Sequence, residues 1–184
     1  MDSARAKRTS KLLSLALRHE PAALGLVLDE AGWAEVESVL AAFAGKGEAV
    51  TREELEAIVR TSDKQRFALS ADGARIRANQ GHSIEVDLGL VPREPPERLF
   101  HGTVDRFLPS IRAAGLLRGE RQHVHLSADR ATAMIVARRR KGEPVPLGVR
   151  ALDMQRDGLR FYLSANGVWL TESVPPRYLE ELGG

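Results

Sequence analysis

One segment, residues 91–98 with the sequence VPREPPER, restricts the fold of this 184-residue chain more than any other. Its three prolines lack the backbone N–H donor that helix interiors and central strands require. Its charges alternate without any helical or strand periodicity. We therefore place a linker at about residues 91–98, between a first domain at residues 1–92 and a second at residues 98–184. Each part must then bury an apolar core of its own.

The composition excludes several classes of protein. It is 43% hydrophobic and 28% charged, as in ordinary globular proteins, and no apolar run approaches the roughly 18 residues of a membrane span. The absence of cysteine excludes disulfides and thiolate metal ligands. A net charge of +2 means that any polyanion would be bound by local clusters rather than by bulk attraction. We expect a cytoplasmic monomer that does not bind membranes.

The first helix is predicted from its two ends. Ser10 can cap it, and it should end near His19 because Pro21 disfavours helix in the residue before it. Residues 1–9 are left outside any helix. Arg18 and His19 then lie together at a helix C-terminus, where they either complement the helix dipole or serve a site.

The rest of the first part predicts two more helices and a hairpin. Apolar residues at helical spacing predict a helix over residues 35–43, and a capping box at residues 51–54 begins another. Short strands at residues 66–70 and 74–78 flank an Asp-Gly turn. Three helices followed by a hairpin is the order of a winged helix, a module that often binds nucleic acid.

Residues 63–83 are unusually rich in groups that can bind anions. Guanidinium, amide, imidazole and hydroxyl groups follow one another there with few large apolar side chains, and Gly81 permits close approach of a ligand. We interpret this stretch as a phosphate-binding surface. Its candidate residues are Lys64, Arg66, Arg75, Arg77, Gln80, His82 and Ser83.

The second part is predicted to be a small, mostly β domain with two helices, over residues 105–114 and 128–140. Its predicted strands include residues 145–152, 159–163 and 168–171. His101, Gly102 and Thr103 lie where a strand runs into a turn, and glycine would let a planar ligand reach the backbone. The second helix ends in residues 138–140, three consecutive arginines, which form either a solvated helix end or an anion site.

Metal binding is a weak alternative for the histidines. His123 and His125 share one face of a strand, but two ligands do not make a site, and neither His-x3-His nor His-Glu-x-x-His occurs. We expect no metal.

Several stretches, in order along nearly the whole chain, resemble the RNA 2'-phosphotransferase family of the KptA type, which includes the tRNA 2'-phosphotransferase of tRNA splicing. The most specific are DKQRF at residues 63–67, IRANQGHS at 76–83, FHGT at 100–103 and HVHLS at 123–127. The others are residues 10–13 with 17–19, 24–26 with 32–33, 138–142, 161–162 with 164–171, and 175–179.

The resemblance implies an α+β fold and a two-step reaction. It implies an N-terminal winged-helix-like lobe for RNA and a C-terminal β-rich lobe with the ADP-ribosyltransferase fold for NAD+. The 2'-phosphate of the RNA, which is tRNA-like, would displace nicotinamide from NAD+. The resulting 2'-phospho-ADP-ribosylated RNA would then be resolved by the ribose 2''-hydroxyl into 2'-hydroxyl RNA and ADP-ribose 1'',2''-cyclic phosphate.

The resemblance also implies roles for individual residues. The catalytic set falls on Arg18, His19, Arg66 and Arg139. Because Ala137 replaces the family's glycine and one residue is inserted, Arg140 is the alternative to Arg139. The residues implied to bind NAD+ are His101, Gly102, Thr103, His125, Ser127 and Val168.

Two other functions stay open. One is an ADP-ribosyltransferase that modifies terminal phosphates of nucleic acid and stops after the first step. The other is a winged-helix regulator whose second domain only senses NAD+. A DNA reader would need suitable polar side chains on a recognition helix, whereas the second predicted helix offers Glu35, Glu37 and Ser38.

Overall fold

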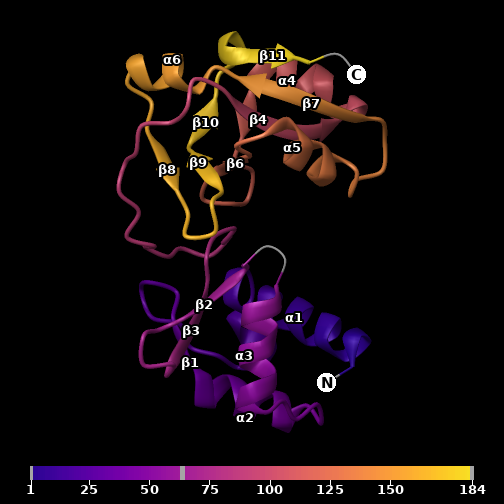
Figure 1. Cartoon of the computed structure of the whole chain (residues 1–184), viewed down its shortest axis with the longest axis vertical. Helices are drawn as coiled ribbons and strands as arrows, with labels where there is room; N and C mark the ends of the chain where they lie inside the picture. The colour runs from indigo at the N-terminus through magenta and orange to yellow at the C-terminus, as the bar shows by residue number, and fades with distance from the viewer. Residues whose placement is uncertain (1, 63–64, 183–184) are drawn as a thin grey trace. The chain divides into compact units, whose positions relative to one another are not determined.

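The computed structural model describes residues 2–62 and 65–182, and Figure 1 traces the chain. The chain divides into two compact units, Met1–Gly89 and Leu90–Gly184. This division falls immediately before the predicted linker. The mixed α and β character that the sequence predicts is confirmed. The assignment of RNA and NAD+ to the two parts stays a prediction.

The first unit consists of three α-helices and a small antiparallel sheet among its described residues (Figure 1). The strand order in the sheet is β1-β3-β2, so β1 pairs with the far strand of the predicted hairpin. The elements are α1 (Ser3–Arg18), η1 (Pro21–Leu24), β1 (Ala34–Glu35), α2 (Val36–Gly45), α3 (Arg52–Thr61), β2 (Phe67–Leu69) and β3 (Arg75–Ala78).

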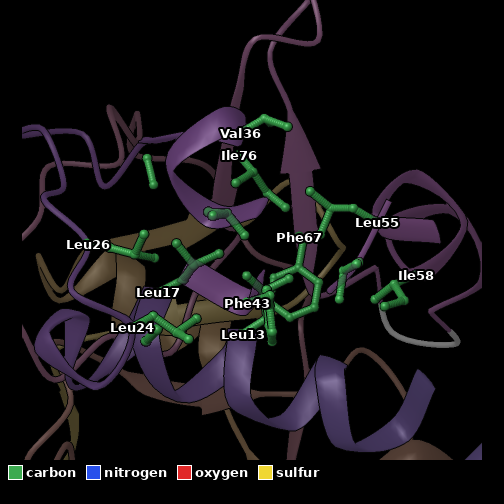
Figure 2. Close-up of a cluster of buried hydrophobic side chains, with 14 of the residues drawn as sticks. Leu13, Leu17, Leu24, Leu26, Val36, Phe43, Leu55, Ile58, Phe67 and Ile76 are labelled. Atoms are coloured by element: carbon green, nitrogen blue, oxygen red, sulfur yellow. The ribbon is translucent and has the colours of Figure 1, made fainter. Parts of the chain in front are cut away.

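The core of this unit forms where the apolar faces of the three helices meet the sheet. Figure 2 shows Leu13 and Leu17 of α1 beside Phe43 of α2, with Phe67 and Ile76 contributed by the strands. All five side chains are almost fully buried. Helix α1 is therefore held by its buried face, and its C-terminal residues are fixed relative to the sheet.

Helix α1 begins earlier than the sequence predicted. It starts at Ser3, because the side chain of Asp2 caps it by accepting a hydrogen bond from the Arg5 N–H at 2.8 Å. Thr9 is buried, so the first turns also pack against the unit. The prediction that the first nine residues lie outside a helix is wrong for residues 3–9, since a polar N-cap and a buried threonine carry no apolar signature.

Two local predictions for this unit are confirmed. Helix α3 has the reciprocal capping box of Thr51 and Glu54. Strands β2 and β3 form the predicted hairpin, with Phe67 opposite Ala78. Residues 84–90 contain no strand and run as an extended segment.

The second unit contains two three-stranded antiparallel sheets and a short two-stranded pair. The sheet orders are β11-β7-β4, β6-β9-β8 and β10-β5. The elements are β4 (Leu99–Val104), η2 (Asp105–Phe107), α4 (Leu108–Ala114), β5 (Leu116–Leu117), β6 (Val124–Leu126), α5 (Arg130–Ala137), β7 (Pro144–Val149), α6 (Ala151–Arg156), β8 (Phe161–Leu163), β9 (Trp169–Thr171), β10 (Ser173–Val174), η3 (Pro176–Tyr178) and β11 (Leu179–Glu181).

Two predictions for this unit are wrong in extent. Helix α6 was not predicted; its buried residues Ala151 and Met154 follow directly on strand β7, and the sequence reads there as a longer strand. Helix α5 ends at Ala137, and the following turn is tightened by a hydrogen bond from the Arg140 N–H to the Ala137 carbonyl at 3.0 Å. The three arginines thus lie beyond the helix and are not a regular helix end.

Across residues 2–62 and 65–182, the structure contains no helix long and apolar enough to cross a membrane.

Candidate functional site

In the first unit, the C-terminus of α1 is joined to the segment that follows β3. The Ser83 N–H donates to the Arg18 carbonyl at 2.9 Å. The His19 Nδ1 and Ser83 Oγ atoms are also 2.9 Å apart, within hydrogen-bonding distance. A helix end and a loop more than sixty residues apart in sequence are therefore fixed together, with an imidazole and a hydroxyl exposed at the junction.

The backbone of Arg66 forms a second link between these segments. Its carbonyl accepts hydrogen bonds from Arg18 Nη2 at 3.5 Å and from the Asn79 N–H at 2.9 Å. The Asn79 side-chain amide donates to the carbonyl of Gln65, whose φ of 40° is the single positive value outside glycine in the described chain. These bonds hold the residue before Arg66 in a left-handed conformation that is uncommon for a side chain of this kind.

His82 lies buried among these groups. It is 1% exposed, and neither ring nitrogen has a hydrogen-bond partner within the described residues. Desolvation, reinforced by the nearby cations Arg18, His19 and Arg77, lowers the pKa of His82 to about 4. The imidazole is therefore neutral near pH 7. The charged groups that lower this pKa would also attract an anion to the same place.

Trp33 forms a platform for two of the predicted phosphate-binding residues. The guanidinium carbon of Arg77 lies 4.5 Å from the centre of the indole ring, and that of Arg75 lies 5.5 Å from it. Arg75 also pairs with Asp29 at 3.3 Å. Because Ala34 pairs with Ile76, the register places Trp33 across from Arg77 on the same face of the sheet. The ring thus restricts where the two guanidinium groups can go.

In the second unit, strand β4 presents an ordered edge at His101 and Gly102. Phe100 exchanges two hydrogen bonds with Ser127, at 2.7 and 2.9 Å. Alternate residues of a strand bond to the same side, so Gly102 directs its N–H and carbonyl to that edge too. On the other side Gly102 is paired in register with Pro146 of β7, whose carbonyl accepts from the Leu182 N–H at 3.2 Å instead.

His101 is held in one tautomer. Its Nδ1 lies 3.0 Å from the His125 carbonyl, which can only accept, so Nδ1 carries the proton and Nε2 is an acceptor. Burial lowers the pKa of His101, and the cations Arg140 and Arg121 act in the same direction. Near pH 7 this ring is neutral.

A cavity of about 250 Å³ opens beside these residues. His101, Gly102 and Thr103 form one wall, and Arg140 reaches the cavity from the turn after α5. The Arg140 guanidinium also lies 5.4 Å from the centre of the Phe107 ring. The remaining lining residues are Ser110, Ile111, Ala114, Gly115, Leu116 and Leu117. The lining surface is about equally polar and apolar, and His101, Thr103, Ser110 and Arg140 provide its polar side chains.

Arg121 adds a further cation to this region. Its Nη1 donates to His125 Nδ1 at 2.8 Å, so His125 carries its proton on Nε2. Burial, and then the charge of Arg140, lowers the pKa of Arg121, so the two guanidinium groups are close enough to repel each other. An anionic ligand would relieve that repulsion.

A model of one protein family, described as "RNA 2'-phosphotransferase, Tpt1 / KptA family", matches residues 4–173. The chain belongs to the RNA 2'-phosphotransferase family. Three relatives named "Probable RNA 2'-phosphotransferase" illustrate the similarity. That from Agrobacterium fabrum is 57% identical, with 93% of this chain and 91% of the relative covered. That from Rhodopirellula baltica is 54% identical over 93% of both chains. That from Pseudomonas aeruginosa is 53% identical over 98% of this chain and 100% of the relative.

Within this RNA 2'-phosphotransferase family member, the structure brings most predicted residues of the first unit together. Arg18, His19, Arg77, His82 and Ser83 cluster through the contacts above. Arg66 joins them through its backbone, and its side chain is half-buried. Arg75 lies on the Trp33 platform, and Gln80 is half-buried with its side-chain oxygen sequestered from solvent. Lys64 lies outside the described residues.

The predicted residues of the second unit fall into two groups. His101, Gly102 and Thr103 line the cavity, with His125 and Ser127 bonded to that strand. Val168 lies elsewhere, in a turn where its N–H donates to Ser164 Oγ at 3.0 Å. Arg139 and Arg140 are both exposed, but only Arg140 is among the residues that line the cavity.

The sequence did not identify Trp33 or Arg121 as site residues. It also gave ligand approach as the only reason for glycine at position 102. A Cβ on Gly102 would lie 1.9 Å from the Ala133 carbonyl oxygen, so packing of α5 against β4 already requires glycine. The pairing of β1 with β3, which places Trp33, is a tertiary contact without a local sequence signal. The hydrogen bond from Arg121 to His125 spans only four residues, but no sequence motif marks it.

Among the described residues, no group of three or more His, Asp or Glu side chains is arranged to hold a metal ion.

Proposed function

We propose that the protein is an NAD+-dependent RNA 2'-phosphotransferase. It would remove an internal 2'-phosphate from a tRNA-like RNA, forming a 2'-phospho-ADP-ribosylated RNA and then ADP-ribose 1'',2''-cyclic phosphate. The observation that carries the proposal is the convergence of Arg18, His19 and Arg77 around the buried, neutral His82. Family membership names the RNA chemistry, and the cluster has the donors that this chemistry needs.

The cluster in the first unit suits a phosphate dianion. Arginine presents a planar fork that can bind two phosphate oxygens at once, and His19 and Ser83 add shorter donors at the same junction. The first step needs a correctly oriented phosphate more than a strong nucleophile, because nicotinamide leaves through an oxocarbenium-like transition state. In the second step the 2''-hydroxyl attacks phosphorus and the RNA 2'-oxygen leaves. Fixed cations stabilise the charge that builds on the phosphoryl oxygens.

The cavity in the second unit suits part of a dinucleotide. The edge of Gly102 offers a backbone donor and acceptor, His101 Nε2 offers an acceptor, and Arg140 with Arg121 offers positive charge. At about 250 Å³ the cavity accommodates one end of NAD+ rather than all of it. In this proposal NAD+ is a co-substrate that supplies the ribose acceptor for the phosphate.

The same proposal assigns a type to each unit. The order of helices and strands in the first unit is that of a winged helix. The second, with its small antiparallel sheets and the cavity beside β4, would be an ADP-ribosyltransferase-like lobe.

The test is a single incubation of the protein with a short RNA that carries one internal 2'-phosphate, with and without NAD+. NAD+-dependent formation of 2'-hydroxyl RNA and ADP-ribose cyclic phosphate, resolved by mass, is the expected result. An RNA that gains ADP-ribose and reacts no further would identify a transferase instead. No change with NAD+ would refute the proposal.

Neighbouring arginines provide a matched pair for the fourth catalytic position. Because Arg140 lines the cavity and Arg139 does not, we assign the role to Arg140. Arg140→Ala should reduce kcat about a hundred-fold or more, as the loss of a transition-state donor commonly does. Arg139→Ala, which removes the same charge one residue away, should retain most activity. If Arg139→Ala lost more activity than Arg140→Ala, the role would belong to Arg139.

A further inference from the structure

Helix α1 has an outer stripe, defined here as Lys7, Lys11, Ser14 and Arg18. These positions are spaced by four, three and four residues, so they follow one face of the helix. The buried residues Thr9, Leu13, Ala16 and Leu17 occupy the opposite face. Lys7 and Lys11 are exposed, whereas Ser14 and Arg18 are half-buried, so the stripe leads from solvent to an arginine of the proposed phosphate site.

Charge is segregated between the helices of the first unit. Helix α1 contains five basic residues and no acidic one, whereas α3 contains three glutamates and two arginines. Lys7 and Lys11 are exposed. Neither forms an ion pair with any residue in the described ranges 2–62 and 65–182. A helix that only needed solubility would carry both signs, as α3 does.

The dimensions of the stripe match a nucleic-acid strand. Lys7 to Arg18 spans eleven residues, or about 16 Å at the helical rise. A stacked strand carries one phosphate per roughly 3.4 Å, so the stripe could follow about five nucleotides, and fewer of an extended strand.

We infer that the outer stripe of α1 binds the sugar-phosphate backbone of the RNA that flanks the 2'-phosphate. Arg18 would hold the reacting phosphate, and Lys11 and then Lys7 would contact backbone phosphates about three and five nucleotides away from it. The identity of the polyanion as RNA rests on the proposed function. The inference adds a direction for the strand and a dependence of affinity on RNA length, neither of which the phosphate site alone requires.

Binding without turnover tests the inference. The full chain is titrated, with no NAD+ present, into a fluorescent 12-nucleotide RNA that carries one central 2'-phosphate, at several salt concentrations. Lys7→Gln with Lys11→Gln is compared with the wild type. Each lost phosphate contact on a single strand should lower the slope of log K against log [salt] by about 0.7, so the double variant should lose about 1.4. At 0.1 M salt this corresponds to roughly 25-fold weaker binding.

A matched control separates the stripe from net charge. Lys46→Gln with Arg60→Gln removes the same charge from exposed residues at the ends of α2 and α3, outside the stripe. This variant should keep the wild-type slope. A trinucleotide with the same 2'-phosphate should bind the stripe variant and the wild type equally, because it cannot reach the lysines.

The outcomes separate this inference from the proposed function. A reduced slope for the stripe variant alone supports the inference even if the turnover assay shows no reaction. An unchanged slope, or an equal loss in the control variant, overturns it even if the enzyme is active. Circular dichroism of both double variants verifies that α1 remains folded, as the exposure of all four substituted side chains leads us to expect.

Discussion

Substituting Gly102 with alanine would separate packing from ligand binding at the cavity. Gly102 is part of the His-Gly-Thr motif that suggests a ligand turn, yet it also lies under helix α5. A Cβ there would lie 1.9 Å from the Ala133 carbonyl oxygen and 2.9 Å from the Ala137 nitrogen. Both are backbone atoms of α5 and cannot rotate away.

The size of the effect follows from this overlap. Real Cβ contacts stay above 3.0 Å, so α5 would have to withdraw from β4 by about 1 Å. Overpacking of a well-packed core typically costs about 1–3 kcal/mol, and a clash with backbone belongs at the upper end. For a unit of this size, about 3 kcal/mol lowers Tm by roughly 12 °C or more. Withdrawal of α5 would also displace Arg140, which follows it by a single turn.

The assay is thermal unfolding of the Gly102→Ala protein without NAD+, followed by circular dichroism. Gly148→Ala is the control, because a Cβ at that position on β7 would have its nearest neighbour, Glu180 Oε2, at 3.4 Å. We expect Gly148→Ala to unfold close to the wild-type temperature. If Gly102→Ala also kept the wild-type Tm and lost only NAD+ binding, the packing argument would be refuted.

Two further predictions concern the first unit. The pKa of about 4 for His82 lies below the ordinary 6.5, so its contribution to stability is complete above pH 6.5 and declines as the pH falls toward 4. Urea unfolding should therefore show that the free energy of unfolding falls by about 2 kcal/mol between pH 7 and pH 5, and His82→Leu should abolish this decrease. The same pH dependence in both proteins would contradict a buried neutral imidazole. Trp33→Ala should weaken RNA binding roughly two- to fivefold by releasing Arg77, at a cation–π energy of about 0.5–1 kcal/mol, while Trp33→Phe should retain most of the affinity. Fluorescence anisotropy titrations with RNA measure the Kd of both Trp33 variants. Equal Kd values for Trp33→Ala and the wild type would exclude a positioning role for the ring.

Local sequence determined those features that depend on neighbouring residues. The capping box of Thr51 and Glu54, the hairpin around Asp72 and the end of α1 before Pro21 were predictable, because each is set by hydrogen bonds or dihedral limits within a few positions. Motif order along the chain was likewise enough to identify the family. The start of α1 was not predicted, because its N-cap Asp2 is polar and the first turns of the helix have a weakly apolar face.

Tertiary structure decided how these parts become candidate sites. The pairing of β1 with β3 places Trp33 under Arg77, and the hydrogen bonds at the Arg66 carbonyl draw α1 and the segment after β3 together. The tight turn after α5 directs Arg140 rather than Arg139 into the cavity. Apart from that turn, these contacts join residues distant in sequence, so their geometry depends on packing against elements that no local pattern specifies. The sequence alone thus determined which groups could bind phosphate, and the folded chain decided which of them lie together and how they are oriented.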